Sequence, residues 1–409
     1  MSNWKTVTLA DISIGGKGSY GIPAPAVPYS EGKYTYLRIT DINDDGTLNL
    51  SDRKSLDDPA AQEYLLQPND IVFARTGNST GRNYFYNPED GDLVYAGFLI
   101  KFSIDPEKVN PKYIKYYMLS PKYRAWITAF NTGSTRGNIN AQTYANMRID
   151  IPPRKQQDLL VDVLSSLDAK IRVNNQINRN LEEQAKAIFK SWFVDFEPFQ
   201  DGEFVDSELG RIPKDWKVGT LGDIIDLHDH KRIPLSSLQR ENMEKKYPYY
   251  GAASLMDYVD NYLFDGVYTL LGEDGTVVMD DGMPVLQYVW GKFWVNNHAH
   301  ILTGKNGHSA ETLYVLLKNT PVKSIVTGAV QPKISQANLK SIPIIVAPQD
   351  IIRKYGALIE PFFEEIRRNS DESSHLVSIR DTLLPKLLSG EIALPEESIS
   401  DLVEHNPIR

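Results

Sequence analysis

One long segment of helical character occurs twice in the chain, and this repeat constrains the fold more than any other feature. The first copy covers about residues 139–193 and the second about residues 334–388, at a constant offset of 195 residues and without a gap. Arg172, for example, aligns with Arg367. Two copies separated by unlike sequence are not a solenoid, which needs several short repeats. The repeat therefore predicts a pseudo-two-fold molecule in which one duplicated element carries two different globular parts.

Both copies contain a long stretch with the spacing of a coiled-coil helix. Residues 154–193 hold neither glycine nor proline and predict one helix of about 60 Å, at 1.5 Å per residue. Residues 350–389 predict a second helix, in which Pro361 and Pro385 are expected to cause a kink or a break. Seam residues recur at steps of four and three, the heptad of helices that pack knobs into holes. The predicted seam positions are Leu160, Leu164, Leu167, Ile171, Asn174, Asn178, Leu181, Ala185, Ile188 and Trp192 in the first helix, and Tyr355, Ile359, Phe362, Ile366, Asn369, Ser373, Leu376, Arg380, Leu383 and Leu387 in the second.

Polar residues interrupt both seams, and Asn174 aligns with Asn369. A buried asparagine at a seam position fixes the register of two helices at some cost in stability. This shared interruption favours an antiparallel coiled coil within one chain over two unrelated amphipathic helices in separate cores.

The rest of the sequence predicts an α+β fold: two globular α/β domains separated by the two long antiparallel helices. Alternation at residues 34–39 and 71–75 is typical of strands, and residues 111–120 predict a short helix. WKTVTLADI at Trp4 returns as WKVGTLGDI at Trp216, which indicates two related globular domains. The expected boundaries are 1–150 for the first globular domain, 151–195 for the first long helix, 196–215 for a connector, 216–348 for the second globular domain, 349–392 for the second long helix and 393–409 for a tail.

The composition excludes several classes of protein. No run of about 18 apolar residues occurs, so no membrane span is expected, and the polar N-terminus indicates a cytoplasmic protein. With no cysteine, the chain has no disulfide, thiolate zinc site or cysteine nucleophile. A net charge of -9 argues against coating nucleic acid through bulk charge, but it leaves room for local basic patches.

Catalytic motifs are missing from the sequence: no phosphate loop, HExxH, G-x-S-x-G, methyltransferase motif or nuclease-type carboxylate cluster is found. A binding protein without catalysis, cofactor or bound metal is therefore favoured. One alternative is a metal-dependent hydrolase that uses His228, His230, His298 and His300, because residues i and i+2 of a strand face the same side. The interpretation that we favour is that these histidines make hydrogen bonds on a recognition face or in a polar core, because the first domain has no counterpart of them.

Polar, glycine-punctuated loops are the candidate nucleic-acid contacts, since arginine can bind guanine and asparagine can bind adenine through paired hydrogen bonds. The alternative is that they are solvated turns, as we expect for the acidic segment 272–275. In the first domain the candidates are Arg75, Thr76, Asn78, Ser79, Thr80, Arg82, Asn83 and Tyr84, followed by Ser134, Thr135, Arg136 and Asn138. In the second domain they are His228, His230, Lys231, Arg232, Tyr249, Tyr250, Asn296, Asn297 and His298, with Gln331 and Lys333 at the repeat of the 132–140 loop. Different loops on equivalent helices predict two different recognised sequences.

Essentially the whole chain resembles the specificity subunit of type I restriction-modification systems. The motifs that carry the resemblance are PAVPYSEGKYTYLRITDI, NDIVFARTGNSTGRNYFY and NRNLEEQAKAIFKSWFVDFEPF in the first half, and GRIPKDWKVGTLGDI, YPYYGAASLMDYVDNYLFDG, NNHAHIL and IRDTLLPKLLSGEI in the second. The resemblance implies two target-recognition domains, each for one half of a bipartite double-stranded DNA site. It further implies that the helices set the spacer between the half-sites and dock two adenine-specific methyltransferase subunits.

The same resemblance implies a restriction-translocation subunit in the complex and no catalysis by this chain. The methyltransferase would flip the adenine and methylate it with S-adenosylmethionine. Beside the hydrolase, one further alternative stays open: a dimerisation scaffold that does not bind DNA.

Overall fold

The computed structural model describes residues 4–131, 138–328, 330–392 and 394. This part of the chain has an α+β fold, as predicted, and its contacts divide it into two compact units. The first unit comprises Met1–Ile171 and Ser374–Arg409, and the second comprises Arg172–Ser373. Each long helix therefore contributes one segment to each unit.

The first unit contains, among its described residues, one strand pair and two four-stranded sheets. Strand β1 (Lys5–Thr8) pairs antiparallel with β10 (Arg148–Ile151). The sheets have the orders β2-β9-β6-β7 and β3-β5-β4-β8. Their strands are β2 (Ser19–Tyr20), β3 (Val27–Pro28), β4 (Thr35–Leu37), β5 (Lys54–Ser55), β6 (Asp70–Ala74), β7 (Asn83–Phe85), β8 (Leu93–Tyr95) and β9 (Leu99–Ser103); the short helices are α1 (Pro111–Tyr117), α2 (Pro121–Asn131) and α3 (Ala141–Ala145). The strands predicted at 34–39 and 71–75 and the helix predicted at 111–120 correspond to β4, β6 and α1.

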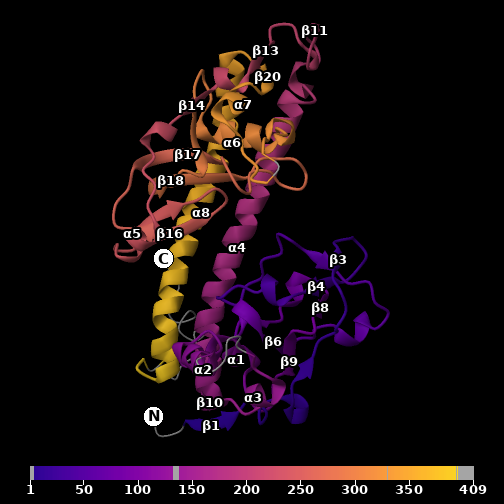
Figure 1. Ribbon diagram of the computed structural model, residues 1–409, viewed down its shortest axis with the longest axis vertical. Coiled ribbons are helices and arrows are strands. Elements are labelled where there is room, and N and C mark those ends of the chain that lie inside the picture. Colours follow the sequence, from indigo (N-terminus) through magenta and orange to yellow (C-terminus); the bar gives the residue numbers. More distant parts are fainter. Residues whose placement is uncertain (1–3, 132–137, 329, 393, 395–409) are drawn as a thin grey trace, which may run out of the picture. The chain divides into compact units, whose positions relative to one another are not determined.

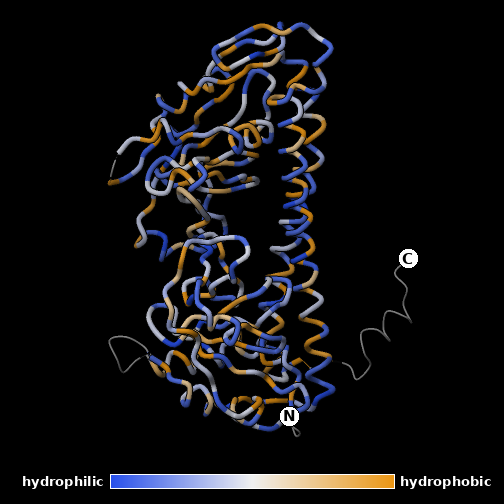
Figure 2. The backbone as a smooth tube through the Cα atoms, turned by 90° about the vertical axis from the view of Figure 1, so that its right-hand side faces the viewer, coloured by the Kyte–Doolittle hydropathy of each residue, from blue (hydrophilic) through white to orange (hydrophobic). Residues whose placement is uncertain are grey.

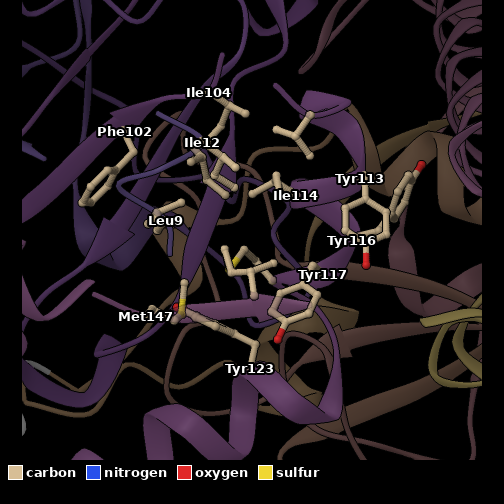
Figure 3. Close-up of a cluster of buried hydrophobic side chains, with 14 of the residues drawn as sticks. Leu9, Ile12, Phe102, Ile104, Tyr113, Ile114, Tyr116, Tyr117, Tyr123 and Met147 are labelled. Carbon is tan, nitrogen blue, oxygen red and sulfur yellow. The ribbon is translucent and has the colours of Figure 1, made fainter. Parts of the chain in front are cut away.

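An apolar core joins the sheet of β9 and β6 to helix α1 and to the long-helix segments of the first unit. Figure 3 shows Phe102 of β9 and Tyr113 and Ile114 of α1 around this core, and all three side chains are fully buried. Leu164 and Leu387 from the two long helices belong to the same cluster. Burial of each such side chain contributes roughly 1.5–3 kcal/mol, so the sheet and the helix segments stabilise one another.

The second unit is built around a sheet in the order β14-β19-β17-β18-β15-β16. Its long antiparallel hairpin, β17–β18, pairs Phe264 with Phe293, and α6 is buried along its length at Ala310–Leu317. The strands are β11 (Phe204–Ser207), β12 (Gly210–Pro213), β13 (Lys217–Thr220), β14 (Ile225–Leu227), β15 (Tyr247–Tyr250), β16 (Leu255–Val259), β17 (Phe264–Gly272), β18 (Leu286–Val295), β19 (Ala299–Gly304) and β20 (Pro343–Val346); the short helices are α5 (Ser237–Glu241), α6 (Ala310–Lys318) and α7 (Gln336–Lys340).

The sequence repeat has a structural counterpart in the strand pair that precedes each long helix. Lys5 pairs with Ile151 in β1–β10, and Lys217 pairs with Val346 in β13–β20, so both pairs have the same register. Beyond them, the N–H of Leu9 donates to the carbonyl of Met147, and the N–H of Leu221 donates to that of Ile342. The duplication therefore includes the strands that anchor each helix as well as the helices.

The long helices are α4 (Arg154–Phe193) and α8 (Gln349–Ser389), which confirms both predicted spans (Figure 1). Each begins after a proline whose carbonyl accepts the first helical N–H groups, Pro153 for α4 and Pro348 for α8. Helix α8 ends before Gly390, whose φ of 72° suits the left-handed residue that commonly follows a helix. In Figure 2, hydrophobic and hydrophilic residues alternate along the long helices.

The break expected at Pro361 and Pro385 does not occur, because α8 is one continuous helix through both residues. A proline removes one backbone hydrogen bond, and packing on either side can offset that loss. Ile359 and Phe363 are buried beside Pro361, and Leu384 and Leu387 are buried beside Pro385.

The predicted seam lies on the packed side of both helices, since none of its residues is exposed. In the second unit, Asn174 Nδ2 donates to Ser373 Oγ at 3.3 Å, and Asn369 Nδ2 donates to Asn178 Oδ1 at 3.0 Å. These two contacts are related by the 195-residue repeat. Tyr355 lies against Ala185 further along, so the two helix segments of this unit run antiparallel.

No helix among the described residues is long and apolar enough to cross a membrane.

Candidate nucleic-acid interface

Three segments of the first unit meet around Arg75, where β6 ends. The N–H of Arg75 donates to the carbonyl of Phe98 at 3.1 Å, in the turn before β9. The N–H of Ile139 donates to the carbonyl of Arg75 at 2.9 Å, and Thr76 forms a β-bridge with Asn138. We call the positions of Arg75, Phe98 and Asn138 the first junction.

The second unit contains the same junction with different residues. The N–H of Glu273 donates to the carbonyl of His298 at 2.8 Å, and the N–H of Ile334 donates to that of Glu273 at 2.9 Å. Asp274 forms a β-bridge with Lys333. Glu273, His298 and Lys333, the second junction, thus occupy the places of Arg75, Phe98 and Asn138. Segment 272–275, expected to be a plain turn, is therefore the structural equivalent of the first recognition loop.

Fewer side chains of the first candidate loop, residues 75–84, are available to a ligand than the sequence predicted. The guanidinium of Arg75 lies over the Tyr20 ring, 5.1 Å from its centroid, and Arg75 Nε has no acceptor among the described residues. Arg82 is engaged instead, since its Nε donates to Asp44 Oδ1 at 2.7 Å and its Nη1 to the carbonyl of Ile42 at 3.1 Å. Thr76 and Thr80 are half-buried, and Asn78 is exposed.

Three predicted contacts of this loop point into the protein. Ser79 is buried, and the buried Asn83 donates from Nδ2 to the carbonyl of Met118 at 3.0 Å. The hydroxyl of Tyr84 donates to Asp90 Oδ2 at 2.6 Å, and burial together with this carboxylate raises the pKa of Tyr84. The bonds of Asn83 and Tyr84 hold the loop in shape, and Ser79 is buried within it, so none of the three residues is a candidate contact. Of the four candidates in the second loop, the structure describes Asn138, which is exposed. Ser134, Thr135 and Arg136 lie outside the described residues.

Several candidates of the second unit are also interior. Tyr249 is buried with its hydroxyl against the backbone of Leu235, and the buried Asn296 accepts the N–H of His298 at its Oδ1. Arg232 is largely buried and donates to Glu273 Oε2 at 2.6 Å and to the carbonyl of Ala299 at 2.8 Å. These three residues are structural and are removed from the candidates.

Other candidates of the second unit remain on the surface. His230, Lys231, Asn297, Gln331 and Lys333 are exposed, and Tyr250 is half-buried. Lys333 Nζ lies 3.3 Å from Glu273 Oε1, and His298 pairs through Nδ1 with Asp274. The charges of the second junction are therefore mutually compensated.

The four histidines do not assemble into one metal site. Among the described residues, only His300 of the four belongs to a group of potential ligands, in which it lies with Asp229 and Glu273. His228 is instead bound through Nε2 to Thr303 Oγ1 at 2.8 Å, and burial lowers its pKa. The hydrolase alternative therefore lacks the histidine cluster on which it was based.

The group around His300 is a closed network of ion pairs. His300 is fully buried; its Nδ1 lies 2.6 Å from Asp229 Oδ2, and its Nε2 lies 2.8 Å from the carbonyl of Ile334. Asp229 also accepts from the N–H of Ile301 and from Gln336 Nε2. Burial opposes ionisation of Asp229, but the bond from His300 and the N–H of Ile301 outweigh it and hold the pKa of this carboxyl below its usual value.

Both ring nitrogens of His300 lie against acceptors, the carboxylate of Asp229 and the carbonyl of Ile334. The network ties the segment after β14 to β19 and to the segment before α7. Because Ile334 also donates to Glu273, the network supports the second junction.

Sequence reasoning did not find Tyr20 and Phe98, which lie at the first junction and are exposed by 42% and 57%. Both are hydrophobic residues in strand-like segments, where the sequence alone predicts burial. Single exposed apolar residues are common, so it is their place at the junction with Arg75 that makes these two candidate contact residues.

The sequence matches a family model described as the type I restriction modification DNA specificity domain, over residues 1–183 and 213–372. A type I restriction enzyme MjaIX specificity subunit of Methanocaldococcus jannaschii is 29% identical over 311 residues, 72% of each chain. A type I restriction enzyme HindI specificity subunit of Haemophilus influenzae is 23% identical and covers 96% of this chain and 100% of its own. The crystal structure of a type I restriction-modification system S subunit from M. genitalium, 20% identical, has a TM-score of 0.53 and covers 94% of this chain and 96% of its own. This likeness supports the fold.

Proposed function

Because the chain belongs to the type I restriction-modification DNA specificity family, we propose that each of its two units recognises one half of a bipartite double-stranded DNA site. The duplicated junction carries this proposal. The same three backbone positions hold Arg75, Phe98 and Asn138 in one unit and Glu273, His298 and Lys333 in the other. Side chains of such different chemistry bind different base edges, so the two half-sites differ in sequence.

The recognition domains in this proposal are residues 1–150 and 216–348. The candidate contacts of the first domain are Arg75, Thr76, Asn78, Thr80 and Asn138, with Ser134, Thr135 and Arg136 as further predictions; Arg82 closes the loop. Those of the second domain are His228, His230, Lys231, Tyr250, Asn297, His298, Gln331 and Lys333.

The long helices are proposed to set the spacer between the half-sites and to dock two methyltransferase subunits. A coiled coil suits this task because its seam fixes the length and register of the helix pair. A restriction-translocation subunit would complete the assembly. The relatives are named as subunits of type I restriction enzymes, which supports partners of this kind.

The chain itself is proposed to perform no chemistry and to need no cofactor. S-adenosylmethionine would be bound by the methyltransferase subunit, which flips the target adenine out of the duplex and methylates it. The complex would act on double-stranded DNA in the cytoplasm.

The test is co-expression of the full chain with its methyltransferase subunit in a host free of adenine methylation, followed by genome-wide mapping of methyladenine. We expect two short half-sites at a fixed distance. Omission of this chain should abolish the pattern, while an inactive methyltransferase with this chain present serves as the second control. Methylation that is unchanged without this chain would overturn the proposal.

A further inference from the structure

Phe98 is an exposed aromatic residue on a rigidly held turn. The N–H of Leu99 donates to the carbonyl of Ala96 at 2.8 Å, and the N–H of Gly97 donates to that of Ile22 at 2.9 Å. Ala96 and Leu99 in the same turn are buried, whereas the Phe98 side chain is exposed. Because Phe98 also accepts the N–H of Arg75, its backbone is fixed from three directions.

Arg75, the backbone partner of Phe98, brings a cation and a second aromatic ring to the same junction. The guanidinium of Arg75 stacks on Tyr20, whose hydroxyl accepts the N–H of Ala141 at 3.2 Å. Within the part of the chain that the structure describes, no carboxylate lies at ion-pair distance from Arg75. The first junction therefore carries a cationic donor and an exposed apolar side chain on two bonded backbone positions, both preorganised by bonds that need no ligand.

We propose that Phe98 is a specificity-determining residue, which packs on the C5-methyl group of a thymine adjacent to a guanine bound by Arg75. This inference rests on the proposed function. The thymine methyl is the apolar group that base pairs present in the major groove, while guanine presents the O6 and N7 acceptors that match a guanidinium. A fixed phenyl ring beside a guanidinium complements both groups at once.

The second unit supports this assignment by contrast. His298 stands where Phe98 stands, but it is paired with Asp274, and Glu273 replaces Arg75 beside it. The second junction consists of polar side chains that pair with one another, so it has no apolar surface on which a methyl group could pack. The thymine contact is therefore a property of the first half-site, and loss of Phe98 leaves recognition of the second half-site unchanged.

The experiment measures binding of the complex of chain and methyltransferase to duplexes that carry the mapped site. Each thymine of the first half-site is replaced in turn by deoxyuridine, which lacks the methyl group. At one position we expect wild-type affinity to fall about fourfold, the effect of one buried methyl group. Phe98→Ala should lower affinity for the unmodified site about tenfold or more and should be insensitive to deoxyuridine at that position.

Ile14→Ala is the matched control, because Ile14 is also a strongly exposed apolar residue and lies beside the opposite end of β9. It should bind like the wild type and keep the deoxyuridine effect. Phe98→Leu, which preserves an apolar surface, should retain most of the affinity. Thermal unfolding checks that all variants fold equally well.

Three outcomes would overturn the inference. Phe98→Ala could bind every duplex as the wild type does, or it could lose affinity without coupling to any deoxyuridine position. It could also fail to assemble with the methyltransferase although it folds normally, which would make Phe98 a protein contact. In each case bipartite methylation by the wild-type complex would still stand, so failure of the inference is separable from failure of the proposed function.

Discussion

Arg75 and Arg82 lie in the same loop, but their surroundings give them different tasks. Arg82 is paired with the exposed Asp44 and with a backbone carbonyl, so it closes the loop. Arg75 stacks on Tyr20 and keeps Nε without an acceptor among the described residues. Stacking restricts the guanidinium to one plane, which lowers the cost of ordering it on a base.

Arg75→Ala should therefore weaken binding of the first half-site by about 1–3 kcal/mol and relax specificity at one base pair. Arg53→Ala is the control, because Arg53 also stacks on a tyrosine, Tyr29, but lies away from the junction. Fluorescence anisotropy with cognate and single-mismatch duplexes measures both effects. Equal affinity of Arg75→Ala and Arg53→Ala for every duplex would show that Arg75 does not contact a base.

The buried pair of His300 and Asp229 illustrates why a metal-like cluster need not bind metal. Every acceptor of Asp229 already has a donor, and Arg232 neutralises Glu273. A buried charge stays in place only when it is paired and hydrogen-bonded, and removal of one partner leaves the other uncompensated.

Asp229→Asn should destabilise the second unit by about 3–5 kcal/mol, measured by urea unfolding. His230→Asn, at an exposed histidine of the same segment, is the control. Because the folded state lowers the pKa of Asp229, its stabilising contribution is present above the unfolded pKa near 3.8 and is lost as the pH falls through the folded pKa. The difference between wild type and Asp229→Asn should therefore persist at neutral pH and shrink progressively as the pH falls below about 4. A constant difference down to pH 2 would contradict this account.

At the scale of elements, the polar residues at the centre of the seam fix the alignment of the two long helices at the expense of stability. Asn174 Nδ2 reaches Ser373 and Glu372, yet Asn174 Oδ1 has no donor among the described residues. A buried acceptor without a donor costs free energy that a leucine would not. The asparagine is best explained as a device that selects one alignment of two nearly identical helices.

Asn174→Leu should raise the free energy of unfolding by about 1 kcal/mol. The same change should make the register and partner choice of the helix pair less specific. Asn369 keeps its bond to Asn178 in this variant, so no new unpaired donor arises there. The exposed Asn175→Leu is the control. Calorimetry measures stability, and mass photometry measures self-association through mispaired helices. A strongly destabilised Asn174→Leu would mean that the bond to Ser373 contributes more than the unpaired oxygen costs.

At the scale of the whole molecule, the helices carry the proposed spacing function. Both α4 and α8 are continuous across the point where the chain divides into two units, between residues 171 and 172 and between 373 and 374. Any insertion at these points changes helix length without altering either recognition domain.

Insertion of one heptad at both points should lengthen the spacer by about three base pairs, since seven residues span about 10.5 Å and a base pair about 3.4 Å. Methyladenine mapping of the variant complex gives the new spacing. Insertion of four residues, which puts the seam out of phase, is the control and should abolish methylation. An unchanged spacer after the heptad insertion would show that the helices do not set it.

The helices and their repeat followed from the sequence because they are properties of linear order. Heptad spacing, the absence of glycine and proline from 154–193 and the offset of Asn174 and Asn369 are all visible without any long-range contact. The exception is the break expected at Pro361 and Pro385, since local propensity predicts it and α8 nevertheless continues through both residues, with Ile359, Phe363, Leu384 and Leu387 packed beside them.

Tertiary structure determines which of the candidate side chains lie on the surface and can contact a ligand. Composition made Asn83 and Tyr84 look like surface groups, but contacts with Met118 and Asp90 turn them inward. The equivalence of Arg75 with Glu273 has no sequence signal, because it depends on backbone bonds from segments distant in the chain. The sequence by itself determined the duplicated scaffold, whereas only the fold decided which side chains of each unit face a ligand.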